Sequence, residues 1–143
     1  MSARLAALAL AACLCALPAA AAEGDVAAPQ ALEQAQAGQL TIIDIRTPEE
    51  WRQTGVVPGA KRVNLYVTGG AAAFLSGILE AVGGDRTAPL ALICRTGNRS
   101  AKAAAFLRAQ GFSAVTDIGE GMAGSGKGPG WIKRGLPVEN CNC

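Results

Sequence analysis

One cysteine stands among residues that could turn it into a nucleophile. Cys94 begins the segment 94–100, which reads CRTGNRS and contains two arginines and one glycine. A helix starting just after the cysteine would direct unpaired N–H groups and the positive end of its dipole at the sulfur. These surroundings favour the thiolate, the nucleophilic form of cysteine. The segment therefore predicts covalent chemistry at Cys94.

The chain contains no histidine, and this limits how the thiol can be activated. Cys–His and Ser–His catalytic pairs are excluded. Metal sites with histidine ligands are excluded as well. Activation falls to backbone N–H groups, a helix dipole and the arginines, and we expect no metal and no cofactor.

The flanking segments predict the elements that position the cysteine. Residues 89–93 form an apolar run typical of a buried strand, and the alanine-rich stretch 100–110 has the period of a helix. A strand, a tight loop and a helix would place the sulfur at the bottom of the loop. The proposed chemistry needs that sulfur open to solvent and the loop N–H groups turned toward it.

The rest of the chain alternates between helical and strand-like segments. Helices are expected over 28–37, from Pro48 onward with Thr47 and Glu50 as a capping box, and over 71–82. Strands are expected over 40–45, 62–67 and 114–118, followed by a glycine-rich loop over 119–130. This alternation predicts an α/β fold with a mostly parallel sheet covered on both faces. Its binding crevice would lie at the carboxyl ends of the strands.

Residues 1–22 resemble a secretory signal. One positive charge, Arg4, precedes the apolar stretch 5–17, and alanines at 20–22 suit signal peptidase. We expect this segment to be cleaved, leaving a periplasmic domain over 23–143. A second interpretation is that residues 10–13 (LAAC) form a lipobox, which would attach a lipid to Cys13 and anchor the protein to a membrane.

The domain after residue 22 has twelve basic and eleven acidic residues and few aromatics. This balance, without a basic run, argues against nucleic acid as a partner. Three cysteines remain, Cys94, Cys141 and Cys143, and an odd number leaves at least one thiol unpaired. The two in the tail 139–143 could pair with each other or stay open to partners.

Four motifs, in the right order along the chain, resemble those of single-domain rhodaneses. The segment 44–46 (DIR) resembles the family's Asp-x-Arg after the first strand, and 94–100 its active loop. Residues 47–51 and 55–60 resemble an acidic helix followed by Gly-His-Ile-Pro-Gly-Ala, with Val56 in place of the histidine. Residues 135–138 (GLPV) resemble the closing motif. The resemblance implies a rhodanese-like three-layer fold with a small, mostly parallel central sheet flanked by helices.

The resemblance also implies the activity of an exported thiosulfate sulfurtransferase. The Cys94 thiolate would take the outer sulfur of a small anionic donor such as thiosulfate, and sulfite would leave. The resulting persulfide would pass its sulfur to a thiol, to cyanide or to a partner protein. The donor would be bound by the loop residues that follow the nucleophile: Arg95, Thr96, Gly97, Asn98, Arg99 and Ser100.

Individual roles follow from residue type. Arg95 is the expected donor contact, whereas Arg99 either joins it or ties the loop to an acidic neighbour. The simplest role of Ser100 is to cap the helix. Asp44 and Arg46 are expected to support the site structurally as a buried ionic pair, because buried charges need partners.

Several alternatives remain open at this point. The chain could be a non-enzymatic persulfide carrier or binding module, or a thiol redox protein that uses Cys94 with the tail cysteines. Cys141 or Cys143 could also relay sulfur from a Cys94 persulfide. A phosphatase or arsenate reductase is a weaker alternative, because tyrosine phosphatases have five residues between cysteine and arginine and this loop has four between Cys94 and Arg99.

Overall fold

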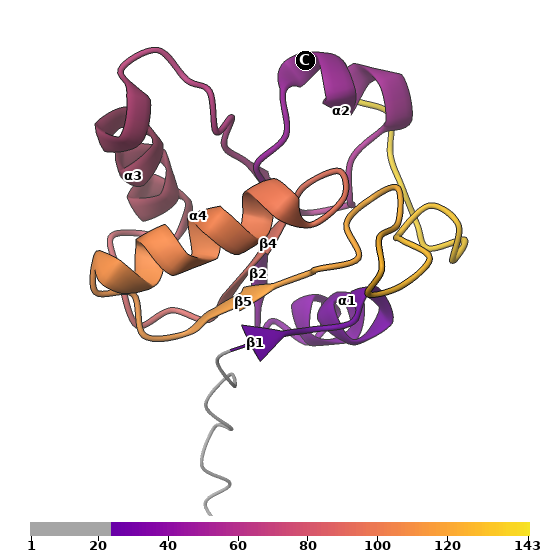
Figure 1. Cartoon of the computed structure of the whole chain (residues 1–143), viewed down its shortest axis with the longest axis horizontal. Helices are drawn as coiled ribbons and strands as arrows, with labels where there is room; N and C mark the ends of the chain where they lie inside the picture. The colour runs from indigo at the N-terminus through magenta and orange to yellow at the C-terminus, as the bar shows by residue number, and fades with distance from the viewer. Residues whose placement is uncertain (1–23) are drawn as a thin grey trace, which may run out of the picture.

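The computed structural model describes residues 24–143, so the expected signal segment and Cys13 lie outside the described residues (Figure 1). A sheet of five parallel strands forms the centre, in the order β1-β5-β4-β2-β3. The strands are β1 Gly24–Asp25, β2 Thr41–Asp44, β3 Lys61–Arg62, β4 Leu90–Ile93 and β5 Val115–Asp117. The helices are α1 Ala28–Gln36, α2 Pro48–Thr54, α3 Gly70–Ala81 and α4 Asn98–Ala109.

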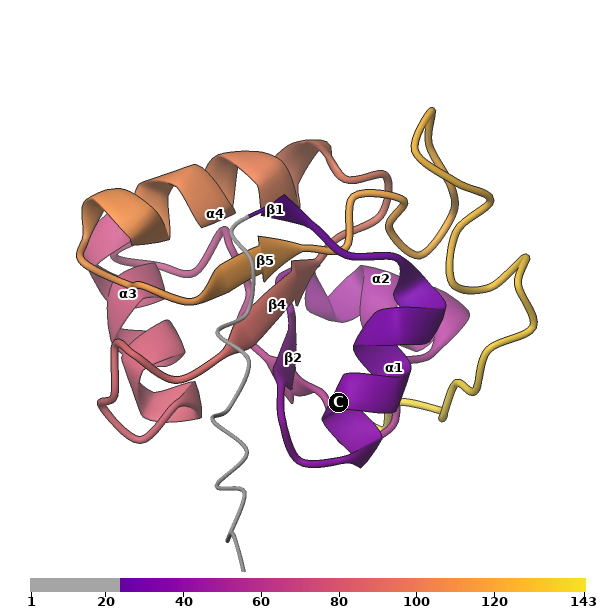
Figure 2. The same ribbon diagram turned by 90° about the horizontal axis from the view of Figure 1, so that it is seen from below.

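Two apolar clusters, one on each face of the sheet, hold the layers together. Phe74 and Ile78 of α3 and Leu107 of α4 pack on one face, and Cys94 belongs to this cluster. Ala28 and Ala31 of α1 pack on the other face, with Trp131 from the C-terminal segment. Figures 1 and 2 show α3 and α4 on one side of the strands and α1 on the other. The predicted three-layer α/β fold is confirmed.

The elements around Cys94 match the sequence closely. Strand β4 is buried at each of its four positions, as expected for an apolar run at the middle of a parallel sheet. Helix α2 begins at Pro48 with the predicted capping box, in which Thr47 and Glu50 satisfy each other's backbone N–H groups. These two elements fix the positions from which the active loop and its supporting carboxylate emerge.

Differences occur where elements are short. The strand predicted over 62–67 is only Lys61–Arg62, because the chain turns after Val63 and the Asn64 side chain accepts the Tyr66 N–H. Strand β1 was not predicted, since two residues carry no periodicity. Residues 131–135 form an irregular turn, and the Trp131 side chain is buried there as part of the core. Within residues 24–143 no helix has the length and apolar character needed to cross a membrane.

Candidate active site

Cys94 lies directly after β4, at the carboxyl edge of the sheet, and its sulfur faces the start of α4. Its Sγ accepts the N–H of Gly97 at 3.1 Å and the N–H of Ser100 at 3.4 Å. The Ser100 hydroxyl oxygen is 3.3 Å from the same sulfur. Two backbone N–H donors, a neighbouring hydroxyl group and the positive end of a 12-residue helix thus converge on one sulfur. Donors in this arrangement suit an acceptor that carries negative charge.

The loop holds its shape because a glycine makes a turn that other residues cannot. Gly97 has a φ of +87° and caps α4, and a Cβ there would collide with the carbonyl of Gly119. The glycine-rich segment also bonds the loop directly, through Met122 N–H to the Cys94 carbonyl (2.9 Å) and Ala123 N–H to the Arg95 carbonyl (2.8 Å). One wall of the site is therefore built by residues 119–123.

Several N–H groups of the loop remain available. The amides of Arg95, Thr96, Asn98 and Arg99 donate no hydrogen bond to another described residue. An unpaired N–H group seeks an anionic or polar acceptor. A loop with two amides on the thiol sulfur and others free can hold a second negatively charged sulfur atom bound to the first.

The requirement that the sulfur be open to solvent is not met. Cys94 is 0% exposed, although Arg95, Thr96 and Asn98 above it are exposed. The reason is that α4 and residues 119–123 close around the loop on two sides. A molecule that reacts with Sγ therefore has to displace part of this enclosure.

Arg99 is engaged by a carboxylate of α2. Its guanidinium forms two hydrogen bonds with Glu50, at 2.8 Å and 2.5 Å. The hydrogen bond from Arg99 lowers the pKa of Glu50 to about 2, against the opposing effect of burial. Glu50 in turn raises the pKa of Arg99, and the nearby Cys94 adds a smaller contribution in the same direction. Of the two roles expected for Arg99, the structure selects the tie to an acidic neighbour.

Arg95 stays free to meet a ligand. Its side chain lines a cavity of about 190 Å³ together with Glu50, Met122 and Ile132. On the other side of the loop, Asn98 and Arg99 border a groove of about 370 Å³ whose remaining lining is mostly apolar. Among the described residues, a cavity and a groove thus border the loop. Only the cavity contains an arginine without a hydrogen-bond partner among those residues, Arg95.

Asp44 and Arg46 form the buried pair that the sequence predicts. Arg46 Nη2 lies 2.7 Å from Asp44 Oδ2, and both side chains are almost wholly enclosed. Arg46 also donates to Thr54 Oγ1 and to the Gly55 carbonyl, which satisfies the rest of its guanidinium. This pair ties β2 to α2 and supports the site without touching Cys94.

The expected capping role of Ser100 is wrong. Gly97 occupies the cap position, and the Ser100 hydroxyl donates to the Gly97 carbonyl at 3.2 Å while lying beside the Cys94 sulfur. The cause is that α4 begins at Asn98, so Ser100 is the third residue of the helix and its side chain faces the loop instead of capping the helix. Lys127, in the glycine-rich segment, pairs with Asp25 at 2.7 Å.

Two buried acidic residues were missed at the sequence level. Asp117, at the end of β5, is 3% exposed and neither oxygen has a hydrogen-bond partner among the described residues. Burial raises its pKa, while Ser100, lying beside it outside hydrogen-bonding geometry, opposes this. Glu120 accepts the N–H groups of Ala28 and Gly130 and a bond from Arg134. Asp117 ends β5 and Glu120 lies just after it, so the rule that parallel strands end at one edge of the sheet could have found them.

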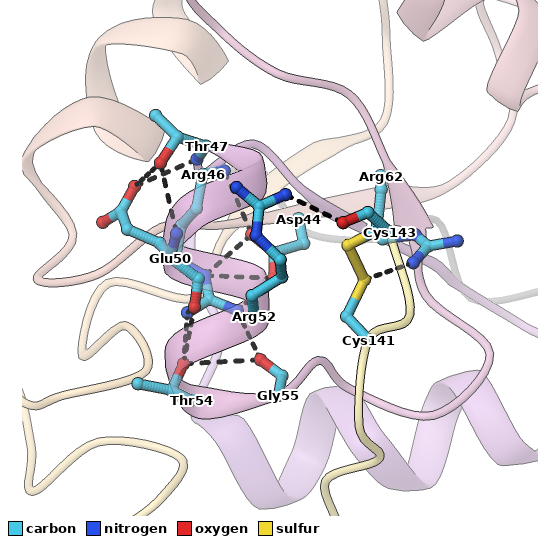
Figure 3. The surroundings of a disulfide bond; sticks show 10 residues. All are labelled: Asp44, Arg46, Thr47, Glu50, Arg52, Thr54, Gly55, Arg62, Cys141 and Cys143. Carbon is cyan, nitrogen blue, oxygen red and sulfur yellow. Dashed lines mark hydrogen bonds and ion pairs between the residues drawn. A yellow bond between two sulfur atoms is a disulfide. The ribbon is translucent and has the colours of Figure 1, made fainter.

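The tail cysteines are paired with each other. Cys141 and Cys143 form a disulfide, and Cys94 is a free thiol. Figure 3 shows this disulfide beside α2, where Arg62 Nη1 lies 2.6 Å from Cys141 Sγ and Arg52 Nη1 lies 2.8 Å from the Cys143 carbonyl oxygen. The alternative in which Cys94 pairs with the tail is therefore not the arrangement found.

Comparisons with known proteins agree with this geometry. The family model described as "Rhodanese-like domain" matches residues 27–125. A sulfurtransferase of Allochromatium vinosum is 28% identical over 99 residues, 69% of this chain and 78% of that protein. An uncharacterized protein of Rickettsia conorii is 30% identical over 105 residues, 67% of this chain and 80% of its own.

Solved structures show the same architecture. A protein of M. tuberculosis superposes with a TM-score of 0.67 at 26% identity, covering 82% of this chain and 98% of that one. A polysulfide-sulfur transferase homodimer from Wolinella succinogenes gives 0.64 at 23% identity, covering 84% and 80%. These structures show the fold, and the family model and the sulfurtransferase relative, together with the cysteine at the carboxyl end of β4, support sulfur transfer in general. The chain belongs to the rhodanese-like family.

Proposed function

We propose that this protein is a sulfurtransferase that moves a sulfane sulfur through a persulfide on Cys94. The Cys94 thiolate attacks the outer sulfur of an anionic donor of the thiosulfate class, the S–S bond of the donor breaks, and sulfite leaves with the bonding electrons. A thiol or cyanide then attacks the outer sulfur of the persulfide and Cys94 leaves as thiolate. This is covalent ping-pong catalysis with balanced charge.

The observation that carries the proposal is the set of N–H groups around the sulfur. Gly97 and Ser100 already bond Sγ, and further loop amides point to no other described acceptor. A persulfide adds one sulfur and keeps one negative charge, which this ring can accept without new side chains. Arg95, free in the cavity beside the loop, suits the anionic end of the donor.

A phosphatase is disfavoured by the same geometry. Arg99 stands where a phosphatase would use its arginine, and here both of its bonds go to Glu50. One superposed structure, from Rhodopseudomonas palustris, is described as a possible tyrosine phosphatase, but at 22% identity it shows the fold alone.

Steady-state release of sulfite from thiosulfate in the presence of cyanide tests the proposal. We expect many sulfite ions per protein molecule and none from Cys94→Ser. A single sulfite per molecule that does not turn over would instead identify a persulfide carrier. Release that persists in Cys94→Ser would contradict the role of this thiol.

A further inference from the structure

The two tail cysteines form a two-electron couple that is independent of Cys94. Cys141 and Cys143 are joined by a disulfide, although they are only two positions apart in the sequence. A cross-link of so few residues restricts the unfolded chain little, so it contributes little to stability by loop closure. Its two thiols are instead placed to react together whenever the bond is reduced.

An arginine favours the thiolate at one of these cysteines. The guanidinium of Arg62 donates to Cys141 Sγ at 2.6 Å and stacks over the Trp51 ring at 5.9 Å from the ring centre. After reduction the same positive charge would lie next to the Cys141 sulfur. A neighbouring cation stabilises a thiolate and so makes Cys141 the more nucleophilic of the two.

Helix α2 touches both sulfur sites. Glu50 holds Arg99 of the Cys94 loop, and Arg52, two positions later on the same helix, holds the Cys143 carbonyl (Figure 3). The last backbone hydrogen bonds of the tail are at Glu139, whose N–H donates to the Val56 carbonyl and whose carbonyl accepts the Val56 N–H. Beyond Glu139 the hydrogen bonds that the described residues give the tail come from Arg52 and Arg62, and the transfer proposed below requires these two bonds to open.

We propose that the reduced Cys141–Cys143 dithiol is an acceptor for the sulfur carried by Cys94 and discharges it as hydrosulfide. The proposal rests on the proposed function, because it needs a Cys94 persulfide. The acceptor of the sulfur is then this chain's own C-terminal segment. In this proposal, the disulfide form of the tail is the product of the sulfur discharge.

The steps balance in atoms and electrons. The Cys141 thiolate attacks the outer sulfur of the Cys94 persulfide, the S–S bond breaks, and Cys94 leaves as thiolate. The Cys143 thiolate then attacks Cys141 Sγ, forms the disulfide and expels hydrosulfide. One sulfane sulfur is reduced by two electrons and the two thiols are oxidised by two, with one proton released to water. A dithiol reductant restores the tail for another cycle.

A single turnover without external thiol tests this chemistry. The full chain is reduced with dithiothreitol, freed of the reductant under anaerobic conditions and mixed with one equivalent of thiosulfate, so that the Cys94 thiolate regenerated by the discharge meets no second donor molecule. We expect one sulfite, one hydrosulfide and one tail disulfide per protein. The Cys141→Ser/Cys143→Ser double variant should release the same single sulfite, produce no hydrosulfide and keep the added sulfur on Cys94.

The outcomes separate this inference from the function on which it rests. Sulfite without hydrosulfide from the unmodified chain would overturn the discharge step and leave the sulfurtransferase standing. Absence of sulfite from both proteins would overturn both proposals. Equal hydrosulfide from Cys94→Ser would show that the dithiol attacks thiosulfate directly, and this too would overturn the transfer from Cys94.

Arg62→Ala tests whether the tail takes part in the reaction, because the rate of hydrosulfide release would not change if the tail had no role. Because the variant removes the cation beside Cys141, we expect hydrosulfide release to slow several-fold while sulfite release keeps its rate. Lys61→Ala is the matched control, since it removes a neighbouring exposed charge of β3 that has no contact with the disulfide. Equal hydrosulfide rates in both variants would contradict the role given to Arg62.

Discussion

The Cys94 loop and the C-terminal tail both hold sulfur, and they hold it by opposite means. Cys94 is enclosed, and backbone N–H groups of Gly97 and Ser100 fix its sulfur. The tail disulfide lies near the surface, and the long side chains of Arg52 and Arg62 hold it. Backbone donors at a helix start cost little further ordering, whereas an arginine gives up side-chain freedom for each contact. The backbone therefore preorganises the donors around Cys94, whereas the tail depends on two long side chains for its position.

Gly97→Ala should disrupt the Cys94 loop more than any other substitution proposed. The new methyl group would collide with the Gly119 carbonyl, and the φ of +87° disfavours any side chain. We expect sulfite release to fall by more than about 100-fold, since misplaced catalytic groups cost rate steeply. Gly126→Ala is the control, because its Cβ meets nothing within 4 Å and its φ is ordinary. Comparable activity in the two variants would show that the turn at Gly97 is dispensable.

Glu50→Gln should weaken the loop less, because it removes an anchor rather than the backbone turn. Arg99 loses its ionic partner, and we expect sulfite release to fall by about tenfold through loss of loop position. Glu49→Gln, one residue earlier and exposed, is the matched control. Full activity of Glu50→Gln would mean that the Arg99 contact does not position the loop.

The same carboxylate makes folding sensitive to acid. Its pKa is about 2 in the folded protein against 4.5 for an unperturbed glutamate, so its stabilising effect is complete above pH 4.5 and is lost as pH falls toward 2. Allowing for partial exposure, we expect about 1–2 kcal/mol to disappear over this range. Denaturant unfolding at pH 5 and pH 3 measures it, and Glu50→Gln should show a smaller change.

Asp117→Asn is expected to stabilise the protein at neutral pH by about 1 kcal/mol or more, because it removes an unpaired buried carboxylate. The folded pKa of Asp117 is raised by burial, so stability present at low pH is lost as pH rises through that pKa. The gain should therefore appear at pH 7 and shrink toward pH 4. Asp85→Asn, at an exposed site whose carboxylate bonds Thr87, should show no such gain.

Opening the tail disulfide should have the smallest effect on the fold. We expect the Cys141→Ser/Cys143→Ser variant to lose no more than about 1.5 kcal/mol of unfolding free energy, because the closed loop is so short. Thermal or denaturant unfolding of the two proteins makes the comparison. A larger loss would mean that the tail supports the core and that the contrast between the two sulfur sites is overstated.

The sequence predicts most of the frame and the nucleophile but only part of the site. The alternation of apolar runs predicts the parallel sheet and β4, and the Thr47–Glu50 capping box predicts the start of α2. Asp44 with Arg46 could be foreseen because a buried charge needs a partner. These inferences depend on local pattern, which a single sequence contains.

The remainder depends on contacts between distant segments. Glu50 and Arg99 meet across 49 positions, and Gly97 is enclosed by Gly119. The enclosure of Cys94 and the place of Ser100 inside the loop follow from that packing, and no local pattern encodes it. For the same reason, the sequence does not decide whether Cys141 and Cys143 pair with each other or stay open to partners, because nothing in it places the arginines that contact them.

Intact mass after incubation with thiosulfate tests the central claim most directly. The account predicts that the Cys141→Ser/Cys143→Ser variant gains one sulfur atom, that Cys94→Ser gains none, and that cyanide removes the addition. An unchanged mass, with Cys94 also inert to a small alkylating reagent, would show that the loop does not admit a donor and would contradict the account.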